Sequence, residues 1–203
     1  MARRNSIFIT GTDTNVGKTV AMYCLGAFFQ SKGLDVGVMK PVQCGGNDAA
    51  FLQKRLNIKD DLALINPVYV KEPLSPHLAL RRAKRRFDLK QVLKAFVVLK
   101  KRHDIVLVEG AGGLMVPLAD GYYNADLAKD LNAEVIIVAR LGLGTINHTL
   151  LTINQAKAKR LKILGVLFSD NNPAPKSIAE KTNPREIERL SGVKVLGVIP
   201  YLK

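Results

Sequence analysis

The nine residues from Gly11 to Thr19, GTDTNVGKT, have the types and spacing of a loop that binds nucleotide phosphates. The loop follows an apolar run typical of a strand and leads into a helical pattern. Backbone N–H groups and the positive end of the helix dipole therefore converge on one point. Gly17 allows close backbone approach, Lys18 can reach the terminal phosphates, and the Thr19 hydroxyl can bind magnesium. The segment predicts a site for a nucleoside triphosphate.

The match to this motif is not literal, because five residues rather than four separate Gly11 from Gly17. We interpret the segment as a variant of the motif. The alternative is an ordinary glycine turn that opens a helix.

Two carboxylates stand where later strands are expected to end. Asp48 closes the segment KPVQCGGND, and Glu109 follows the apolar run Ile105 to Val108 and precedes a glycine-rich turn. Ligands of open parallel sheets lie beyond the carboxyl ends of the strands, and magnesium prefers oxygen ligands. Thr19, Asp48 and Glu109 are therefore the predicted magnesium ligands. The alternatives are that Asp48 only caps a helix and that Glu109 only caps a turn.

Lys40 stands at the end of another predicted strand. Pro41 disfavours a helical conformation at the preceding residue, so Lys40 is expected to project into the same cleft. The alternative is a solvated lysine at a strand end.

Short apolar runs alternate with helical patterns along the whole chain. Most of the runs are continuously apolar, which is typical of strands covered on both faces. The pattern predicts an α/β three-layer sandwich with a mainly parallel central sheet, in a single domain spanning residues 1–203. The expected strands are Ser6–Ile9, Val36–Met39, Ile105–Val108, Val135–Ala139, Leu164–Phe168 and Val195–Ile199. The expected helices are Lys18–Ser31, Ala49–Leu56, Pro76–Arg82, Leu89–Lys101, Ala125–Leu131, Thr145–Lys159 and Pro184–Leu190.

Composition excludes several classes of protein. No apolar stretch approaches the roughly 20 residues that span a bilayer, and the first residues lack the pattern of a secretory signal. With only Cys24 and Cys44, a disulfide framework is excluded. These features predict a cytoplasmic protein without a membrane partner.

The formal net charge of +14 raises the question of nucleic-acid binding. The densest basic cluster, from Arg81 to Arg86, has no interleaved aromatic residues and runs into a helical pattern, so a solvated basic face is the preferred interpretation. We expect no nucleic-acid partner. Part of the excess positive charge can attract anionic substrates.

Five segments in this order resemble the dethiobiotin synthetase family: GTDTNVGKT, KPVQCGG, EPLSPH at 72–77, VEGAGGLMVPL at 108–118 and GTINHTLLT at 144–152. The resemblance implies a P-loop NTPase-like fold and a homodimer. It also implies the conversion of 7,8-diaminopelargonic acid, CO2 and MgATP to dethiobiotin, ADP and phosphate. The implied route passes through a carbamate and a carbamic-phosphoric anhydride, and a cyclic urea closes at the end.

The resemblance also implies roles for individual residues. Thr19, Asp48 and Glu109 would bind magnesium, and Lys18 and Lys40 would be catalytic. The residues implied in ATP binding are Asn15, Val16, Gly17, Lys18, Thr19, Val20, Asp48, Glu109, Gly110, Ala111 and Gly112, with Ser169, Asp170, Pro200, Tyr201 and Leu202 near the adenine. The residues implied in diamine binding are Thr14, Lys40 and Cys44, and the partner subunit would hold the distal carboxylate with Gly144, Thr145 and Asn147.

Some segments depart from the family pattern or have a second interpretation. Cys44 stands for the family's substrate-contacting serine, and Ser169-Asp170 stands for its adenine-reading Asn-Asp pair, which leaves base selectivity open. Ser75-Pro76 and Thr145 can also simply begin helices. The main alternative function is a ParA- or MinD-like ATPase switch, but those proteins have a second lysine where this loop has Asp13. A cobyrinate-type amidoligase is less favoured, because the chain shows no attached amidotransferase region.

Overall fold

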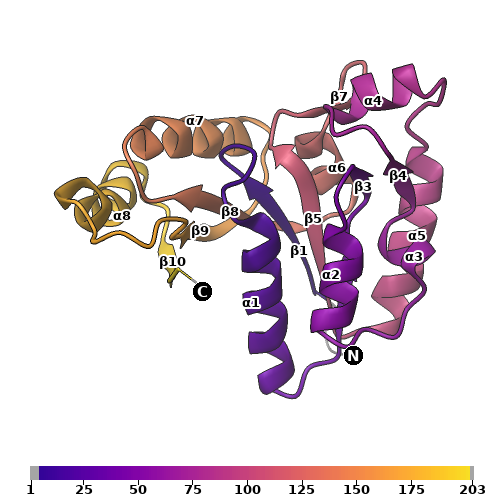
Figure 1. Cartoon of the computed structure of the whole chain (residues 1–203), viewed down its shortest axis with the longest axis horizontal. Helices are drawn as coiled ribbons and strands as arrows, with labels where there is room; N and C mark the ends of the chain where they lie inside the picture. Colours follow the sequence, from indigo (N-terminus) through magenta and orange to yellow (C-terminus); the bar gives the residue numbers. More distant parts are fainter. Residues whose placement is uncertain (1–4, 202–203) are drawn as a thin grey trace.

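The computed structural model describes residues 5–201, and a parallel sheet forms its centre. The sheet has six strands in the order β10-β9-β8-β1-β5-β2, and every neighbouring pair is parallel (Figure 1). All six expected strands are confirmed. Their bounds are β1 (Asn5–Gly11), β2 (Val36–Met39), β5 (Ile105–Gly113), β8 (Glu134–Arg140), β9 (Ile163–Ser169) and β10 (Val195–Ile199).

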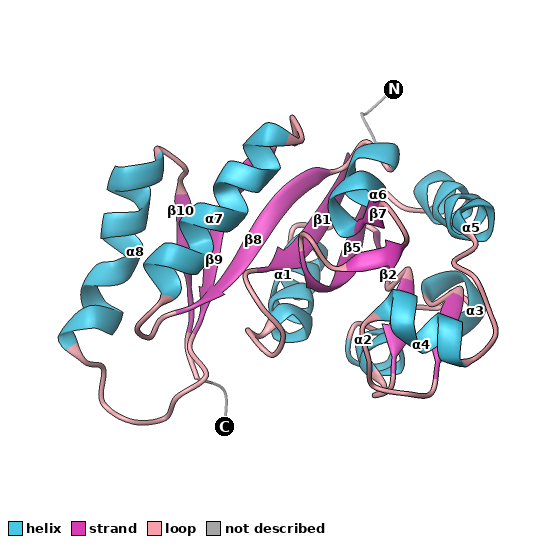
Figure 2. Cartoon of the chain, turned by 90° about the horizontal axis from the view of Figure 1, so that it is seen from above, coloured by secondary structure: helices cyan, strands magenta, loops and turns pink. Residues whose placement is uncertain are grey.

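Helices cover both faces of the sheet, which confirms the predicted three-layer architecture. Figure 2 shows α1 on one side of the sheet and α6, α7 and α8 on the other. The helices are α1 (Lys18–Ser31), α2 (Asp48–Arg55), α3 (Leu62–Ile65), α4 (Pro76–Arg82), α5 (Leu89–Arg102), α6 (Asn124–Asp130), α7 (Thr145–Ala158) and α8 (Ile178–Ser191). Among residues 5–201, none of them is both long and apolar enough to cross a membrane.

Alternate residues of each central strand enter different cores. On β1, Phe8 packs in the core beneath α5, α6 and α7, whereas Ile7 and Ile9 pack in the core beneath α1 and α2. Burial of each such side chain stabilises the fold by about 1.5–3 kcal/mol. Two apolar faces explain why the strands read as continuous apolar runs rather than as alternating ones.

The structure differs from the sequence prediction at α8 and at the shortest elements. Helix α8 begins at Ile178 rather than at Pro184, because Ser177 and Glu180 form a capping box in which each side chain accepts a hydrogen bond from the other's backbone N–H. Periodicity does not detect α3 or the short strands β3 (Val42–Cys44), β4 (Val68–Val70), β6 (Pro117–Ala119) and β7 (Tyr122–Tyr123). The parallel pair β3-β4 lies outside the main sheet and shapes the loop after Lys40.

Candidate active site

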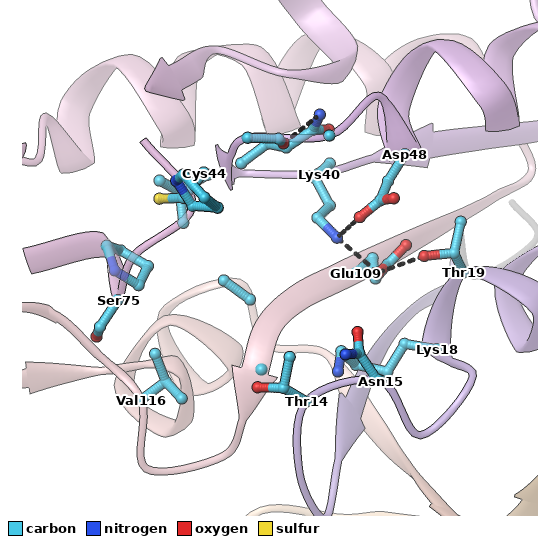
Figure 3. A pocket seen from close by; sticks show the side chains of 18 of the residues that line it. Thr14, Asn15, Lys18, Thr19, Lys40, Cys44, Asp48, Ser75, Glu109 and Val116 are labelled. Carbon is cyan, nitrogen blue, oxygen red and sulfur yellow. Dashed lines mark hydrogen bonds and ion pairs between the residues drawn. The ribbon is translucent and has the colours of Figure 1, made fainter. Parts of the chain in front are cut away.

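A cleft of about 940 Å³ lies beyond the carboxyl ends of β1, β2 and β5. Its walls are the phosphate-binding loop, the loop after β2, the start of α4 and the glycine turn at the end of β5 (Figure 3). Twelve of the predicted site residues line it: Thr14, Asn15, Gly17, Lys18, Thr19, Val20, Lys40, Cys44, Asp48, Glu109, Ala111 and Gly112. Residues far apart in the sequence thus converge where the strand arrangement predicts a ligand.

The phosphate-binding loop needs glycine at Gly17 for two reasons. Gly17 is the N-cap of α1 in the left-handed conformation, with φ of 92°, and an added Cβ would lie 2.3 Å from the Ser169 hydroxyl. No side chain of the described residues caps α1. Backbone N–H groups of its first turn can therefore bind phosphate oxygens.

Lys40 joins the two carboxylates that the sequence assigns to magnesium. Its Nζ lies 2.6 Å from Glu109 Oε1 and 2.7 Å from Asp48 Oδ2. The Thr19 hydroxyl donates a hydrogen bond of 3.0 Å to the same Glu109 oxygen. Figure 3 shows this chain of contacts at the centre of the cleft. Asp48 is not the cap of α2, because Asn47 is the N-cap and Asp48 is the first residue of the helix. Glu109 does not merely cap a turn, because it lies within β5 and contacts Lys40 and Thr19.

The oxygen atoms of this cluster fit magnesium. Glu109 is fully buried, and its Oε2 has no hydrogen-bond partner among residues 5–201. A buried carboxylate oxygen without a partner is costly unless a ligand satisfies it. In the described part of the chain, no three His, Cys, Asp or Glu side chains form a metal-binding group. Two carboxylates and a hydroxyl suit magnesium, which keeps several water and phosphate ligands.

The two lysines have different electrostatic environments. Burial lowers the pKa of Lys18, and the attraction of Glu109 offsets this only in part. Lys18 Nζ donates to the Asp13 carbonyl at 3.1 Å. Burial also opposes the charge of Lys40, but Glu109 and Asp48 outweigh it, so the pKa of Lys40 lies above its usual value and the ammonium stays charged.

Cys44 lines the cleft near Lys40 but is not activated. Burial raises the pKa of the Cys44 thiol, and the nearby Lys40 offsets this only in part. A protonated thiol is a poor nucleophile, so this environment does not favour a reactive Cys44.

Other predicted residues lie outside the cleft. Val16 is buried in the core, and an added Cβ at Gly110 would lie 2.9 Å from the Phe8 ring, so neither can offer a side chain to a ligand. The residues Ser169, Asp170, Pro200 and Tyr201 are not among those that line the cleft, although the Ser169 hydroxyl lies against Gly17 of the phosphate-binding loop. Leu202 lies outside the described residues.

Helix α7 begins at Thr145, as the sequence predicts, and its N-cap is Gly144, with φ of 86°. Thr145 is fully buried, its hydroxyl lies 3.4 Å from that of Thr149, and its N–H donates to the Gly142 carbonyl. The N–H and the hydroxyl of Thr145 therefore have partners within the same chain. Asn147 is exposed, and neither it nor Gly144 lines the cleft of the same chain.

Sequence reasoning missed several residues that line the cleft. Ser75 and Pro76 occupy the N-cap and first turn of α4, as expected, but they also line the cleft together with Pro73 and Leu74. Their place in the motif EPLSPH was the available signal. Gln43 is buried and holds the next loop, since its Oε1 accepts from Ala49 N–H and its Nε2 donates to the Gly45 carbonyl.

Asn171 also lines the cleft and braces the phosphate-binding loop. Its Nδ2 donates to the Asn15 carbonyl at 3.1 Å, and its Oδ1 accepts from the Ser169 hydroxyl at 3.0 Å. Lys176 Nζ lies 2.6 Å from Asp170 Oδ1 and forms an ion pair with it. Burial opposes the charge of Asp170, but hydrogen bonds from Lys176 and from the Asn172 backbone outweigh it and hold the pKa of Asp170 below its usual value. The polar groups that follow β9 are thus engaged within the protein.

Comparison with known proteins decides the family. A family model described as an AAA domain matches residues 5–203. The ATP-dependent dethiobiotin synthetase of Thermodesulfovibrio yellowstonii is 42% identical over 96% of this chain and 88% of its own. The synthetase of Methanococcus vannielii is 37% identical over 95% of this chain and 92% of its own, and that of Bacillus licheniformis is 39% identical over 97% and 86%. The chain belongs to the dethiobiotin synthetase family. Membership confirms the expectation of an ATP-dependent ligase of biotin biosynthesis.

Solved structures of other P-loop proteins share the fold of this dethiobiotin synthetase family member. A ParA family ATPase from Chlorobium tepidum superposes with a TM-score of 0.60 at 13% identity, covering 100% of this chain and 86% of its own. MinD from Pyrococcus horikoshii, in complex with Mg-ADP, gives a TM-score of 0.60 at 18% identity, covering 97% and 81%. At these identities the likeness establishes the P-loop NTPase fold alone.

Proposed function

We propose that this chain closes the cyclic urea of dethiobiotin from 7,8-diaminopelargonic acid and CO2, at the expense of ATP. The observation that carries the proposal is the convergence of Lys18, Lys40 and the Thr19-Asp48-Glu109 oxygen cluster in one cleft. Phosphoryl transfer depends chiefly on positioning and charge neutralisation. The cleft offers both and needs no protein nucleophile.

The chemistry proceeds between substrates. One amine of the diamine traps CO2 as a carbamate, and a carbamate oxygen attacks the γ-phosphorus of ATP and displaces ADP. The second amine then attacks the carbamoyl carbon and displaces phosphate, which closes the ring. Lys18 holds the terminal phosphates, and the Lys40 ammonium neutralises the carbamate and the transferred phosphoryl group. Magnesium, held by Thr19, Asp48 and Glu109, would neutralise phosphate charge.

A coupled assay tests this function. ADP release should require diaminopelargonate and bicarbonate together, and dethiobiotin should form in equal amount. The control omits either substrate. Steady ATP hydrolysis that neither substrate changes would instead favour a nucleotide switch of the ParA or MinD kind.

We expect base selectivity to be weak. The Asn171 amide is hydrogen-bonded through both its oxygen and its nitrogen, and Ser169 stands where the family has asparagine, so neither residue offers adenine a free amide. A site without such contacts has little power to reject other bases. The ratio of kcat/KM for ATP to that for GTP and CTP should stay below about a thousandfold, which corresponds to about 4 kcal/mol. A larger ratio would contradict this explanation.

We also propose a homodimer in which the start of α7 of the partner binds the distal carboxylate. The substrate's carboxylate lies at the far end of an aliphatic chain from its reacting amines, and Gly144 and Asn147 do not line the cleft of their own chain. A helix N-terminus suits a carboxylate.

Subunit mixing tests this arrangement. Homodimers of Lys40→Ala and of Asn147→Glu should each have low activity. In Asn147→Glu the reason is that the added carboxylate repels the distal carboxylate of the substrate. An equimolar mixture should recover about a quarter of the activity, since half the dimers are mixed and half their sites are intact. Asn147 is exposed, whereas Thr145 is fully buried and a charge there would damage the fold. If demonstrated subunit exchange brings no recovery, the carboxylate site lies within one chain.

A further inference from the structure

Lys40 holds the same two carboxylates that the proposed magnesium site requires. Its ammonium lies 2.6 Å from Glu109 Oε1 and 2.7 Å from Asp48 Oδ2 (Figure 3). We propose that Lys40 and a divalent cation compete for Glu109 and Asp48, so that binding of the cation releases Lys40 toward the substrate. The inference rests on the magnesium site of the proposed function and adds a second task for the lysine.

The burial of the cluster makes the competition strong. The Glu109 side chain is fully buried, and the Lys40 side chain is 6% exposed. Buried charges need a close partner of opposite sign, because removal of either partner leaves an uncompensated charge in a medium of low dielectric constant. Lys40 provides that partner for Glu109, and a divalent cation bound to Glu109 and Asp48 would do the same.

The ammonium and a divalent cation cannot share these oxygens. A cation within bonding distance of Glu109 and Asp48 would lie a few ångströms from Lys40 Nζ, where like charges repel strongly. The free oxygen of Glu109, Oε2, offers a first point of attachment, because it has no partner within residues 5–201. Exchange of one cation for the other keeps both carboxylates neutralised.

The backbone around Lys40 is held so that only its side chain needs to move. Lys40 N–H donates to the Ile65 carbonyl at 2.7 Å, and the Lys40 carbonyl accepts from Asn66 Nδ2 at 2.6 Å. The flexible four-carbon stem of lysine can redirect the ammonium without a change of backbone. The cleft on which Lys40 borders also contains Thr14 and Cys44, so the released ammonium stays within reach of a substrate bound there.

This exchange would couple the arrival of the metal–nucleotide complex to the placement of Lys40. Without nucleotide, Lys40 lowers the affinity of the cluster for divalent cations. With nucleotide, the phosphates supply further ligands for the cation and further negative charge for Lys40. The Lys40 ammonium therefore turns toward the substrate only when the phosphates that it neutralises are bound.

Lys18 provides a matched control. It lies in the same cleft and is also buried, but its Nζ donates to the Asp13 carbonyl rather than to a carboxylate. Loss of its charge changes the electrostatic potential of the cleft without freeing Glu109 or Asp48. A comparison of the two lysines therefore separates direct occupation from a general effect of charge.

The test measures Mn2+ binding to the full chain without nucleotide, by electron paramagnetic resonance of the free ion. The Kd for Mn2+ should fall by at least about tenfold in Lys40→Met and in Lys40→Gln, which corresponds to about 1.4 kcal/mol, but by less than about threefold in Lys18→Met. Mg2+ should raise the unfolding temperature of the Lys40 variants more than that of the unmodified protein. If Lys40→Met does not fold, Lys40→Gln, which retains hydrogen-bond donors for both carboxylates, carries the test.

The outcomes distinguish this inference from the proposed site. If the unmodified protein binds ATP more tightly with Mn2+ than in EDTA, but the Lys40 variants bind Mn2+ without nucleotide no more tightly than Lys18→Met, the competition is disproved and the site stands. If Mn2+ does not change the ATP affinity of the unmodified protein, and the Lys40 variants bind no Mn2+ without nucleotide, the metal site itself is wrong.

Discussion

Replacement of Glu109 by glutamine should lower dethiobiotin formation by about a hundredfold to a thousandfold, the range seen when one group that stabilises a transition state electrostatically is removed. The change removes the buried anionic oxygen that accepts from Lys40 and Thr19 and that we assign to magnesium. The fold should survive, because glutamine has the same shape and Lys40 retains its ion pair with Asp48. The measurement is the initial rate as a function of Mg2+ concentration, with circular dichroism to monitor folding.

Asp48→Asn is the matched comparison for Glu109→Gln. The Asp48 side chain is 41% exposed, so water can replace part of what the carboxylate supplies, and we expect a smaller loss of activity. In both variants the loss should be greatest at limiting Mg2+. Activity close to that of the unmodified protein at limiting Mg2+ would remove Glu109 from the proposed metal site.

Loss of the two lysines should affect different steps. Lys18→Ala should weaken ATP binding by about tenfold to a hundredfold, as expected for the loss of a charge-assisted hydrogen bond of about 1.5–3 kcal/mol. Lys40→Ala should lower kcat by about a hundredfold while the Kd for ATP changes by less than about fivefold. The reason is their placement: Lys18 begins α1 inside the phosphate-binding loop, whereas Lys40 follows β2 and contacts Glu109 and Asp48.

Calorimetric titration with ATP and steady-state rates at saturating ATP separate these effects. Arg substitutions provide the control for charge, because Lys18→Arg and Lys40→Arg keep the cation but change its shape. An equal collapse of ATP affinity in Lys18→Ala and Lys40→Ala would show that the two roles are confused.

Local sequence was sufficient for the six strands of the main sheet and for every helix except α3, but not for the short strands β3, β4, β6 and β7. The six strands of the sheet were predicted because each is a continuous apolar run, and strands with two buried faces have this pattern. Most helix bounds follow from periodicity and from turn residues at the ends. The start of α8 was missed because the capping pair Ser177 and Glu180 precedes the first strongly periodic residues.

Local sequence also identified most of the residues that line the cleft, because the phosphate-binding loop and the glycine turn after Glu109 are contiguous motifs. It could not show how side chains from different segments meet. The Lys40–Glu109 contact spans 69 residues and the Thr19–Glu109 contact spans 90. The contact of Asn171 with Asn15 spans 156 residues, and no motif contains both.

The tertiary structure decided these contacts through the order of the strands. The chain runs from β1 to β2 and only later to β5, yet β5 lies between them in the sheet. That insertion brings Glu109 between the phosphate-binding loop and Lys40. Hydrophobic pattern determines that a segment forms a buried strand, but all such strands have similar apolar faces, so the pattern does not specify which strands are neighbours. The sequence by itself therefore determined which groups could do chemistry, and only long-range packing determined that Lys40 lies on the carboxylates assigned to magnesium.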